Sequence, residues 1–229
     1  MNDLTVYYNI NQASCFSVDE IFVEPETIFS YESVERVYNK CPAWSHKAKR
    51  TFLIKAQVDL KLTVAKDKVF CEPKDLEKNL DLTPGWNYNG GCTVQLGNEF
   101  FYLFWTKEKN VWIHQQPYPP TVQKNFSVVE GWYNGSAWNR PLSFGFNVID
   151  REKPVIIKRG DPLFAVSFYT KDLNRKVHLE RTNITHDQYQ NVFKRMAARS
   201  FKSLQSVVYK KMFETTEESK CPMKFLWKK

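Results

Sequence analysis

Several features that define large classes of proteins are missing from this chain of 229 residues. No apolar run reaches the length of about 20 residues that a membrane-spanning helix needs. The first residues, MNDLTVYYNINQ, contain neither the basic region nor the apolar region of a secretory signal. We therefore expect no membrane partner and no signal-directed secretion, and we interpret the sequons at Asn125, Asn134 and Asn183 as accidental.

Cysteines are few and widely spaced. The chain has five of them, with no CxxC pair and no tight Cys/His cluster, at Cys15, Cys41, Cys71, Cys92 and Cys221. An odd number at irregular spacing indicates neither a disulfide framework nor a zinc site. We interpret them as reduced thiols in a cytoplasmic compartment, with a cross-link between Cys41 and Cys221 left open.

Recognisable catalytic motifs are also missing. The sequence contains no GxSxG, no P-loop, no GxGxxG and no carboxylate pair placed as acid and base. Its four histidines have no HxH or HxxxH spacing, so we expect none of them to bind a metal. From the sequence we assign no catalytic residue, no metal site and no cofactor, and an enzyme is the less favoured class.

Aromatic and basic residues are abundant instead. Aromatic residues make up 15% of the chain and hydrophobic residues 42%, which is typical of a folded protein with a large core. Phe, Tyr and Trp also pack well on the pleated surface of sheets. The net charge of +8 suits an acidic partner such as nucleic acid, but the charge is spread along the chain and mostly indicates a solvated surface.

Alternating apolar and polar residues predict strands over much of residues 41–182. From Lys55 onward, Ala56, Val58, Leu60, Leu62 and Val64 fall on one predicted face. VHLERT predicts a further short strand, and PVIIKRGDPLFAVSFYT predicts a β-hairpin-like pair. In its turn, Gly160 supplies an unusual backbone angle, Asp161 bonds local amides and Pro162 fixes the exit direction. We interpret these three residues as structural.

The pattern changes at Asn183, where a capping box at Thr185–Gln188 precedes apolar residues at three- and four-residue steps. The predicted fold class is mainly β, as a β-clip or a β-sandwich or barrel, with one long C-terminal amphipathic α-helix. We expect an extended or β segment over 1–40 packed on the core and a β domain over 41–182. The helix covers 183–213 and a tail 214–229.

The stretch SVVEGWYNGSAWNRPLSFGFNVIDREKPVIIKRGDPLFAVSFY, residues 127–169, resembles the closing half of the dUTPase and dCTP deaminase family. The matching parts are Gly131-Trp132, the strand 142–148, residues 154–157 and residues 160–168. The resemblance implies a β-clip fold, which is often trimeric. Tyr133 and Asn134 stand where that family has the Asp that activates water, so the resemblance supports the fold and argues against the reaction.

A second resemblance covers residues 39–170. The segments NKCPAWSHKAKRTFLIKAQVDL, LTPGW, RPLSFGFNV and IKRGDPLFAVSF look like uncharacterised proteins of tailed phages of marine bacteria, including cyanophages. This resemblance implies a phage origin and a β domain, with the protein in the host cytoplasm or in the virion.

Aromatic residues in Gly/Asn-rich turns lie beside Lys or Arg and form the candidate binding set: Trp86, Tyr88, Trp132, Tyr133, Asn134, Trp138 and Arg140. Such residues suit a protein interface, which we favour, or a stacking surface for single-stranded nucleic acid. We expect a protein partner or a homo-oligomer, with nucleic acid as a further option.

The predicted function is that of a non-catalytic, phage-encoded β-rich structural or interaction protein, either a virion or assembly component or a binder of a host factor. The first alternative is a divergent nucleotide-binding enzyme related to dUTPase and dCTP deaminase. The second is a single-stranded nucleic-acid-binding protein.

Overall fold

The structure, a computed structural model, describes residues 3–10, 22–31, 40–65, 68–83, 92–96, 102–135, 142 and 144–183. Strands in several sheets dominate these residues, so the prediction of a mainly β protein is confirmed. The predicted helix beyond Asn183 and the tail over 214–229 lie outside the described residues. None of the described helices combines the length and apolar character that crossing a bilayer requires.

The described strands are β1 (Leu4–Ile10), β2 (Glu26–Thr27), β3 (Thr51–Lys55), β4 (Leu60–Ala65), β5 (Lys68–Glu72), β6 (Leu80–Thr83), β7 (Cys92–Leu96), β8 (Tyr102–Trp105), β9 (Trp112–Gln116), β10 (Phe126–Val128), β11 (Gly131–Asn134), β12 (Gly145–Val148), β13 (Val155–Ile157), β14 (Pro162–Tyr169) and β15 (Val177–Arg181). The described helices are short: α1 (Ile28–Tyr31), α2 (Pro42–Ala48) and the 3-10 helices η2 (Lys74–Asn79) and η4 (Pro119–Lys124). The strands therefore contain about half of the described residues, and the helices far fewer.

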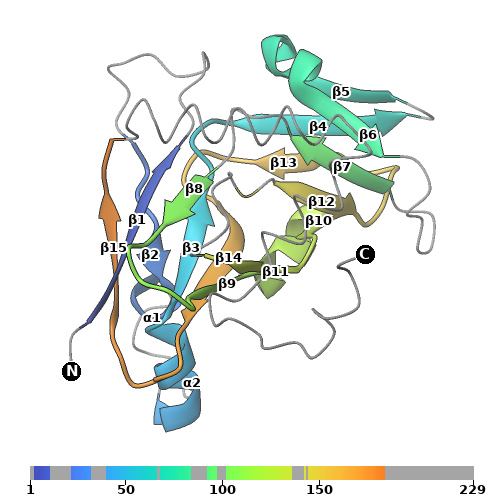
Figure 1. The fold of residues 1–229 in the computed structure, drawn as a ribbon. Helices are drawn as coiled ribbons and strands as arrows, with labels where there is room; N and C mark the ends of the chain where they lie inside the picture. Colours follow the sequence, from blue (N-terminus) through green and yellow to red (C-terminus); the bar gives the residue numbers. More distant parts are fainter. Residues whose placement is uncertain are drawn as a thin grey trace, which may run out of the picture.

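These strands form four sheets (Figure 1). The five-stranded sheet has the order β11-β9-β14-β3-β2, and the four-stranded sheet has the order β10-β12-β7-β6. Two three-stranded sheets, which we call the β1 sheet and the β4 sheet, have the orders β15-β1-β8 and β13-β4-β5. Each sheet is open at both edges within the described strands, so these strands do not form the barrel that was one of the predicted alternatives.

Two antiparallel strand pairs form one ribbon that bends from the five-stranded sheet into the β4 sheet. β3 pairs with β14 before the bend, and β4 pairs with β13 after it. At the bend, the Gly160 N–H donates to the Ala56 carbonyl oxygen at 2.8 Å, and the Ala56 N–H donates to the Asp161 carbonyl oxygen at 2.9 Å. Gly160 has a φ of 86°, which a residue with a Cβ rarely adopts. We call residues 56–59 and 158–161 the ribbon corner.

The ribbon corner corrects two predictions from the sequence. The hairpin-like pair predicted for PVIIKRGDPLFAVSFYT is wrong, because β13 and β14 do not pair with each other and lie in different sheets. The alternating strand from Lys55 to Val64 is interrupted at residues 56–59, although Leu60 and Leu62 are buried as predicted. Alternation indicates which face of a strand is buried, but it does not indicate where the chain passes from one sheet to another.

Polar side chains hold the ribbon corner in shape. The Asp59 carboxylate accepts hydrogen bonds from the Arg159 N–H at 2.8 Å and from Lys158 Nζ at 3.2 Å. The Asp161 carboxylate accepts a hydrogen bond from the Lys158 N–H at 2.6 Å and pairs with Lys124 Nζ of η4 at 2.5 Å. Both carboxylates thus satisfy backbone groups that the bend removes from the strand ladder.

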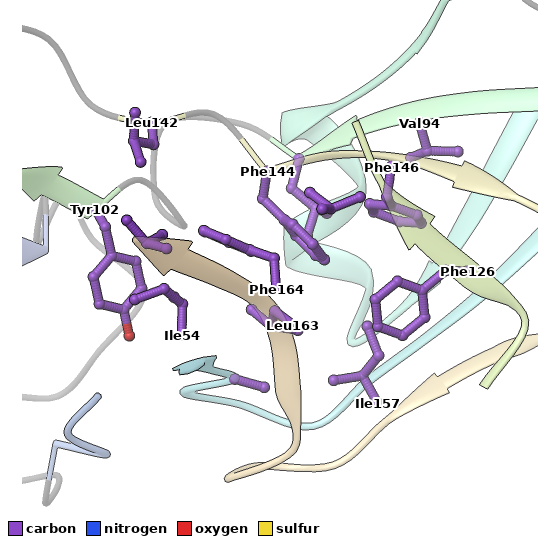
Figure 2. Packing of buried hydrophobic residues seen from close by; sticks show 14 of the residues in the cluster. Ile54, Val94, Tyr102, Phe126, Leu142, Phe144, Phe146, Ile157, Leu163 and Phe164 are labelled. Carbon is purple, nitrogen blue, oxygen red and sulfur yellow. The ribbon is translucent and has the colours of Figure 1, made fainter. Parts of the chain in front are cut away.

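One hydrophobic cluster contains residues of all four sheets. Near its centre, four fully buried phenylalanines pack together (Figure 2). The ring centroid of Phe144 lies 4.8 Å from that of Phe146 and 5.7 Å from that of Phe164, and Phe126 lies 5.5 Å from Phe146. Aromatic pairs at these separations stabilise a core beyond the area that they bury. The four sheets are therefore held by a shared core.

The described part of the predicted segment 1–40 joins this core. β1 lies between β15 and β8, and its residues Leu4, Val6 and Tyr8 are buried. The predicted short strand at VHLERT is confirmed as β15, which pairs with β1 in the parallel direction. Gln57 fixes the approach to β2, because its side-chain amide donates to the Val23 carbonyl oxygen at 2.8 Å and accepts from the Val23 N–H at 2.9 Å.

Replacing Phe164 with Ala should lower the free energy of unfolding by about 3 to 5 kcal/mol, because the change leaves a cavity among buried rings. Phe70 in β5 is 48% exposed, and Phe70→Ala should change the same quantity by less than about 0.5 kcal/mol. Urea unfolding measures both. Equal losses for the two variants would contradict the proposed centre of the core.

An ion pair joins the segment after β8 to the segment that leads into β15, next to the start of β1. Arg175 donates to both carboxylate oxygens of Glu108, at 2.6 Å each, and to the Asp3 carbonyl oxygen at 3.1 Å. The hydrogen bonds from Arg175 hold the pKa of the Glu108 carboxyl below its ordinary value of 4.5. Folding therefore favours the ionised form of Glu108.

A group whose pKa is lower in the folded state contributes stability above its ordinary pKa and loses it as the pH falls. We expect Glu108→Gln to reduce the loss of stability on acidification below about pH 5. Unfolding by urea across this pH range measures the effect. Glu72→Gln, which changes an exposed carboxylate on β5, is the matched control and should follow the parent protein; an unchanged pH dependence in Glu108→Gln would refute the expectation.

Candidate binding surface

One row of side chains crosses four strands on the outer face of the five-stranded sheet. Trp132 of β11 lies opposite His114 of β9, His114 lies opposite Ser167 of β14, and Ser167 lies opposite Thr51 of β3. Residues directly opposite each other in a sheet point to the same face, so these four side chains are neighbours. The next row belongs to the other face and contributes to the main core: Ile113, Phe168 and Tyr133.

Trp132 lies flat on His114. The two ring centroids are 4.0 Å apart and the ring planes differ by 6°. The Trp132 ring also contacts Tyr169, with 5.2 Å between the centroids. Trp132 is 48% exposed whereas His114 is only 8% exposed, so the indole covers the imidazole and presents its own outer surface to solvent.

Glu130 holds the imidazole of His114 through a hydrogen bond. Its carboxylate oxygen Oε1 lies 2.6 Å from His114 Nε2. A carboxylate accepts hydrogen bonds, so we assign the proton to Nε2. His114 Nδ1 is buried and has no hydrogen-bond partner among the described residues. We call Trp132, His114, Tyr169 and Glu130 the Trp132 platform.

A series of hydrogen bonds links β9, β14 and β3 beside this platform, on the same face of the sheet. The Gln116 side-chain amide donates to Ser167 Oγ at 2.8 Å, and Ser167 Oγ lies 2.7 Å from Thr51 Oγ1. Thr51 Oγ1 in turn donates to the Lys47 carbonyl oxygen of α2 at 2.9 Å. Since Thr51 uses its only proton for Lys47, the Ser167 hydroxyl donates to Thr51. Gln116, Ser167 and Thr51 thus each donate to an acceptor in this series of hydrogen bonds. The series favours one arrangement of these three side chains.

The structure separates the consecutive residues of the predicted binding set. Trp132 faces outward, Tyr133 packs against the main core from the other face, and Asn134 is almost fully buried. In β11, therefore, only Trp132 offers a broad surface to a partner. Four further members of the set lie outside the described residues: Trp86, Tyr88, Trp138 and Arg140. The three predicted turn residues are at the ribbon corner or directly beside it: Gly160, Asp161 and Pro162, the last being the first residue of β14.

The other residues of the Trp132 platform were not found from the sequence. The sequence points to His114 only as one of four histidines without metal-ligand spacing, and to Tyr169 only as part of a predicted strand. They come from β9 and from the end of β14, and only strand pairing brings them to Trp132. A usable signal was the alternation in WIHQQ, which places His114 on the opposite face from the buried Ile113.

No family model matches the chain, and no match was found among curated proteins. Within the part of the chain that the structure describes, no group of three or more His, Cys, Asp or Glu side chains is arranged to hold a metal ion. The Trp132 platform is the arrangement from which we infer function.

Replacing His114 with Ala should lower the free energy of unfolding by about 1 to 3 kcal/mol, because the indole loses the ring on which it lies. His114→Phe should recover at least half of this loss, since a phenyl ring restores the stacking surface and removes the unpartnered Nδ1. Urea unfolding measures stability, and near-ultraviolet circular dichroism reports the packing of the tryptophans. Identical losses in both variants would show that stacking does not support Trp132.

Proposed function

We propose that the chain is a non-catalytic interaction protein that binds a protein partner through the Trp132 platform. The observation that carries this proposal is a half-exposed tryptophan lying on a buried, hydrogen-bonded histidine. Trp and Tyr provide a large part of the binding energy in protein interfaces, and the platform contains one of each. The exposed face of this indole does not contribute to the packing of the main core, so it is available to a partner.

Preorganisation supports the same proposal. Binding costs free energy when loops and side chains must be ordered, so a surface that is already fixed loses less on association. Trp132 contacts His114 and Tyr169, and His114 is held by Glu130. All but Glu130 are on paired strands, and Glu130 directly precedes β11. The platform is therefore preorganised, and binding a partner would cost little free energy for ordering its side chains.

The resemblance of residues 39–170 to proteins of tailed phages supports a partner from the phage particle or from the host. A phage-encoded interaction protein would act as a virion or assembly component, or would bind a host factor. A second copy of this chain is also a possible partner, because a self-complementary surface gives a symmetric dimer.

Single-stranded nucleic acid is the second candidate ligand, since a base can stack on an exposed indole and the net charge of +8 would attract phosphates. The carboxylate of Glu130 disfavours it, because Glu130 lies two residues before Trp132 on the same face of the sheet and would repel a phosphate next to the stacked base. We therefore favour a protein partner.

Trp132→Ala should reduce the capture of partner proteins by the immobilised chain by roughly tenfold or more, because truncating a central aromatic residue removes binding energy of this size. Phe70→Ala is the matched control: it removes an equally exposed aromatic ring from the β4 sheet and should capture as the parent does. Quantitative mass spectrometry of proteins retained from phage particles and host lysate gives the readout, and light scattering reports self-association.

Equal capture by Trp132→Ala and the parent would refute a binding role for the platform. Binding of oligothymidylate that weakens steeply with salt would support the nucleic-acid alternative instead. Turnover of dUTP or dCTP would support the enzyme alternative and remove the non-catalytic part of the proposal.

A further inference from the structure

We infer that the Trp132 platform receives an arginine side chain of the partner protein, an inference that rests on the binding function proposed above. An arginine would lay its guanidinium plane on the outer face of the indole and donate a hydrogen bond to the carboxylate of Glu130. The platform supplies both elements of such a site, an exposed aromatic face and an adjacent acceptor with negative charge.

The geometry leaves both elements accessible. His114 occupies the inner face of Trp132, with the rings parallel and 4.0 Å apart, so a ligand can stack only on the outer face. Glu130 uses Oε1 to accept from His114, and its side chain is 57% exposed. Its second oxygen, Oε2, has no hydrogen-bond donor within the described part of the chain and is free to accept from a ligand.

Charge favours a cation. No described Lys or Arg lies within ion-pair distance of the Glu130 carboxylate, which contacts only His114 among the described basic side chains. An indole face attracts a cation through its negative quadrupole, and a nearby carboxylate adds to that attraction. An anionic ligand group would meet repulsion from the same carboxylate.

Arginine suits this site better than lysine. The guanidinium group is planar, stacks on aromatic rings and still presents N–H donors at its edge to a carboxylate. A lysine ammonium is compact and strongly hydrated, so it gains less from lying on an indole. The His114 and Trp132 rings are stacked in parallel, and a guanidinium group could stack on the indole in the same way, as the outermost of three flat groups.

The probe is N-acetylarginine N-methylamide, titrated into the full chain labelled with ¹⁵N. The indole N–H signal of Trp132, identified by its loss in Trp132→Phe, gives the readout. We expect a saturable shift of this signal at roughly millimolar concentration, as suits a ligand of few atoms. The citrulline counterpart has nearly the same shape without the charge and should produce no saturable shift.

Glu130→Gln tests the role of the charge, since a glutamine oxygen can still accept from His114 while the negative charge is lost. It should weaken binding of the arginine probe by roughly tenfold, whereas Glu72→Gln, on the β4 sheet, should bind as the parent does. Near-ultraviolet circular dichroism confirms that the platform is intact in both variants.

Failure of this inference differs from failure of the proposed function. Equal binding of arginine and citrulline, unchanged binding by Glu130→Gln, or no saturable shift of the Trp132 signal would each overturn the arginine site. A shift with oligothymidylate but not with arginine would also overturn it. If Trp132→Ala nevertheless loses its captured partners, the binding function stands without the arginine; if it keeps them, the binding function itself falls.

Discussion

The ribbon corner is the constraint on which the rest of the described structure depends. It lets two strand pairs turn together, so that residues before the bend belong to the five-stranded sheet and residues after it belong to the β4 sheet. Backbone hydrogen bonds between Ala56 and Gly160 continue through the bend, and Asp59 and Asp161 satisfy the amides left over. With this path fixed, both sheets cover one core, and the backbone groups named here have hydrogen-bond partners at the bend.

The five-stranded sheet has two different faces as a result. Its inner face gives Phe52, Phe164 and Phe168 to the core, where shape and apolar area decide stability. Its outer face carries polar groups that are buried yet paired, and the hydroxyls of Ser167 and Thr51 are examples. Burying a polar group costs free energy unless a hydrogen bond offsets the cost, so the pairing of these two hydroxyls favours their observed arrangement. The indole of Trp132 is positioned on this face by its contacts with His114 and Tyr169.

The sequence predicts the β class and the buried positions of β4 correctly, because alternation depends on local burial alone. It predicts a hairpin at the RGDP turn, and this prediction is wrong. Strand pairing depends on strands that are far apart in the sequence but close in the fold: β13 pairs with β4, and β14 pairs with β3. The candidate site is found only through Trp132. The partners of that residue are separated from it in sequence, and no local pattern reports that His114 and Tyr169 share its face. Tyr133 fails as a binding residue for a simpler reason: it follows Trp132 directly, and consecutive strand residues point to opposite faces.

Net charge and local charge give opposite indications for this protein. A chain with a charge of +8 is expected to attract anions at long range. The short-range environment of Trp132 is nevertheless set by Glu130, the one charged group that contacts the platform histidine in the described structure. Salt in the cell screens interactions beyond about 8 Å, so contacts at the indole are governed by the nearby carboxylate more than by the overall charge. In the proposed site, Glu130 would therefore select the ligand that stacks on Trp132, and a cationic group would interact favourably with both the ring and the carboxylate.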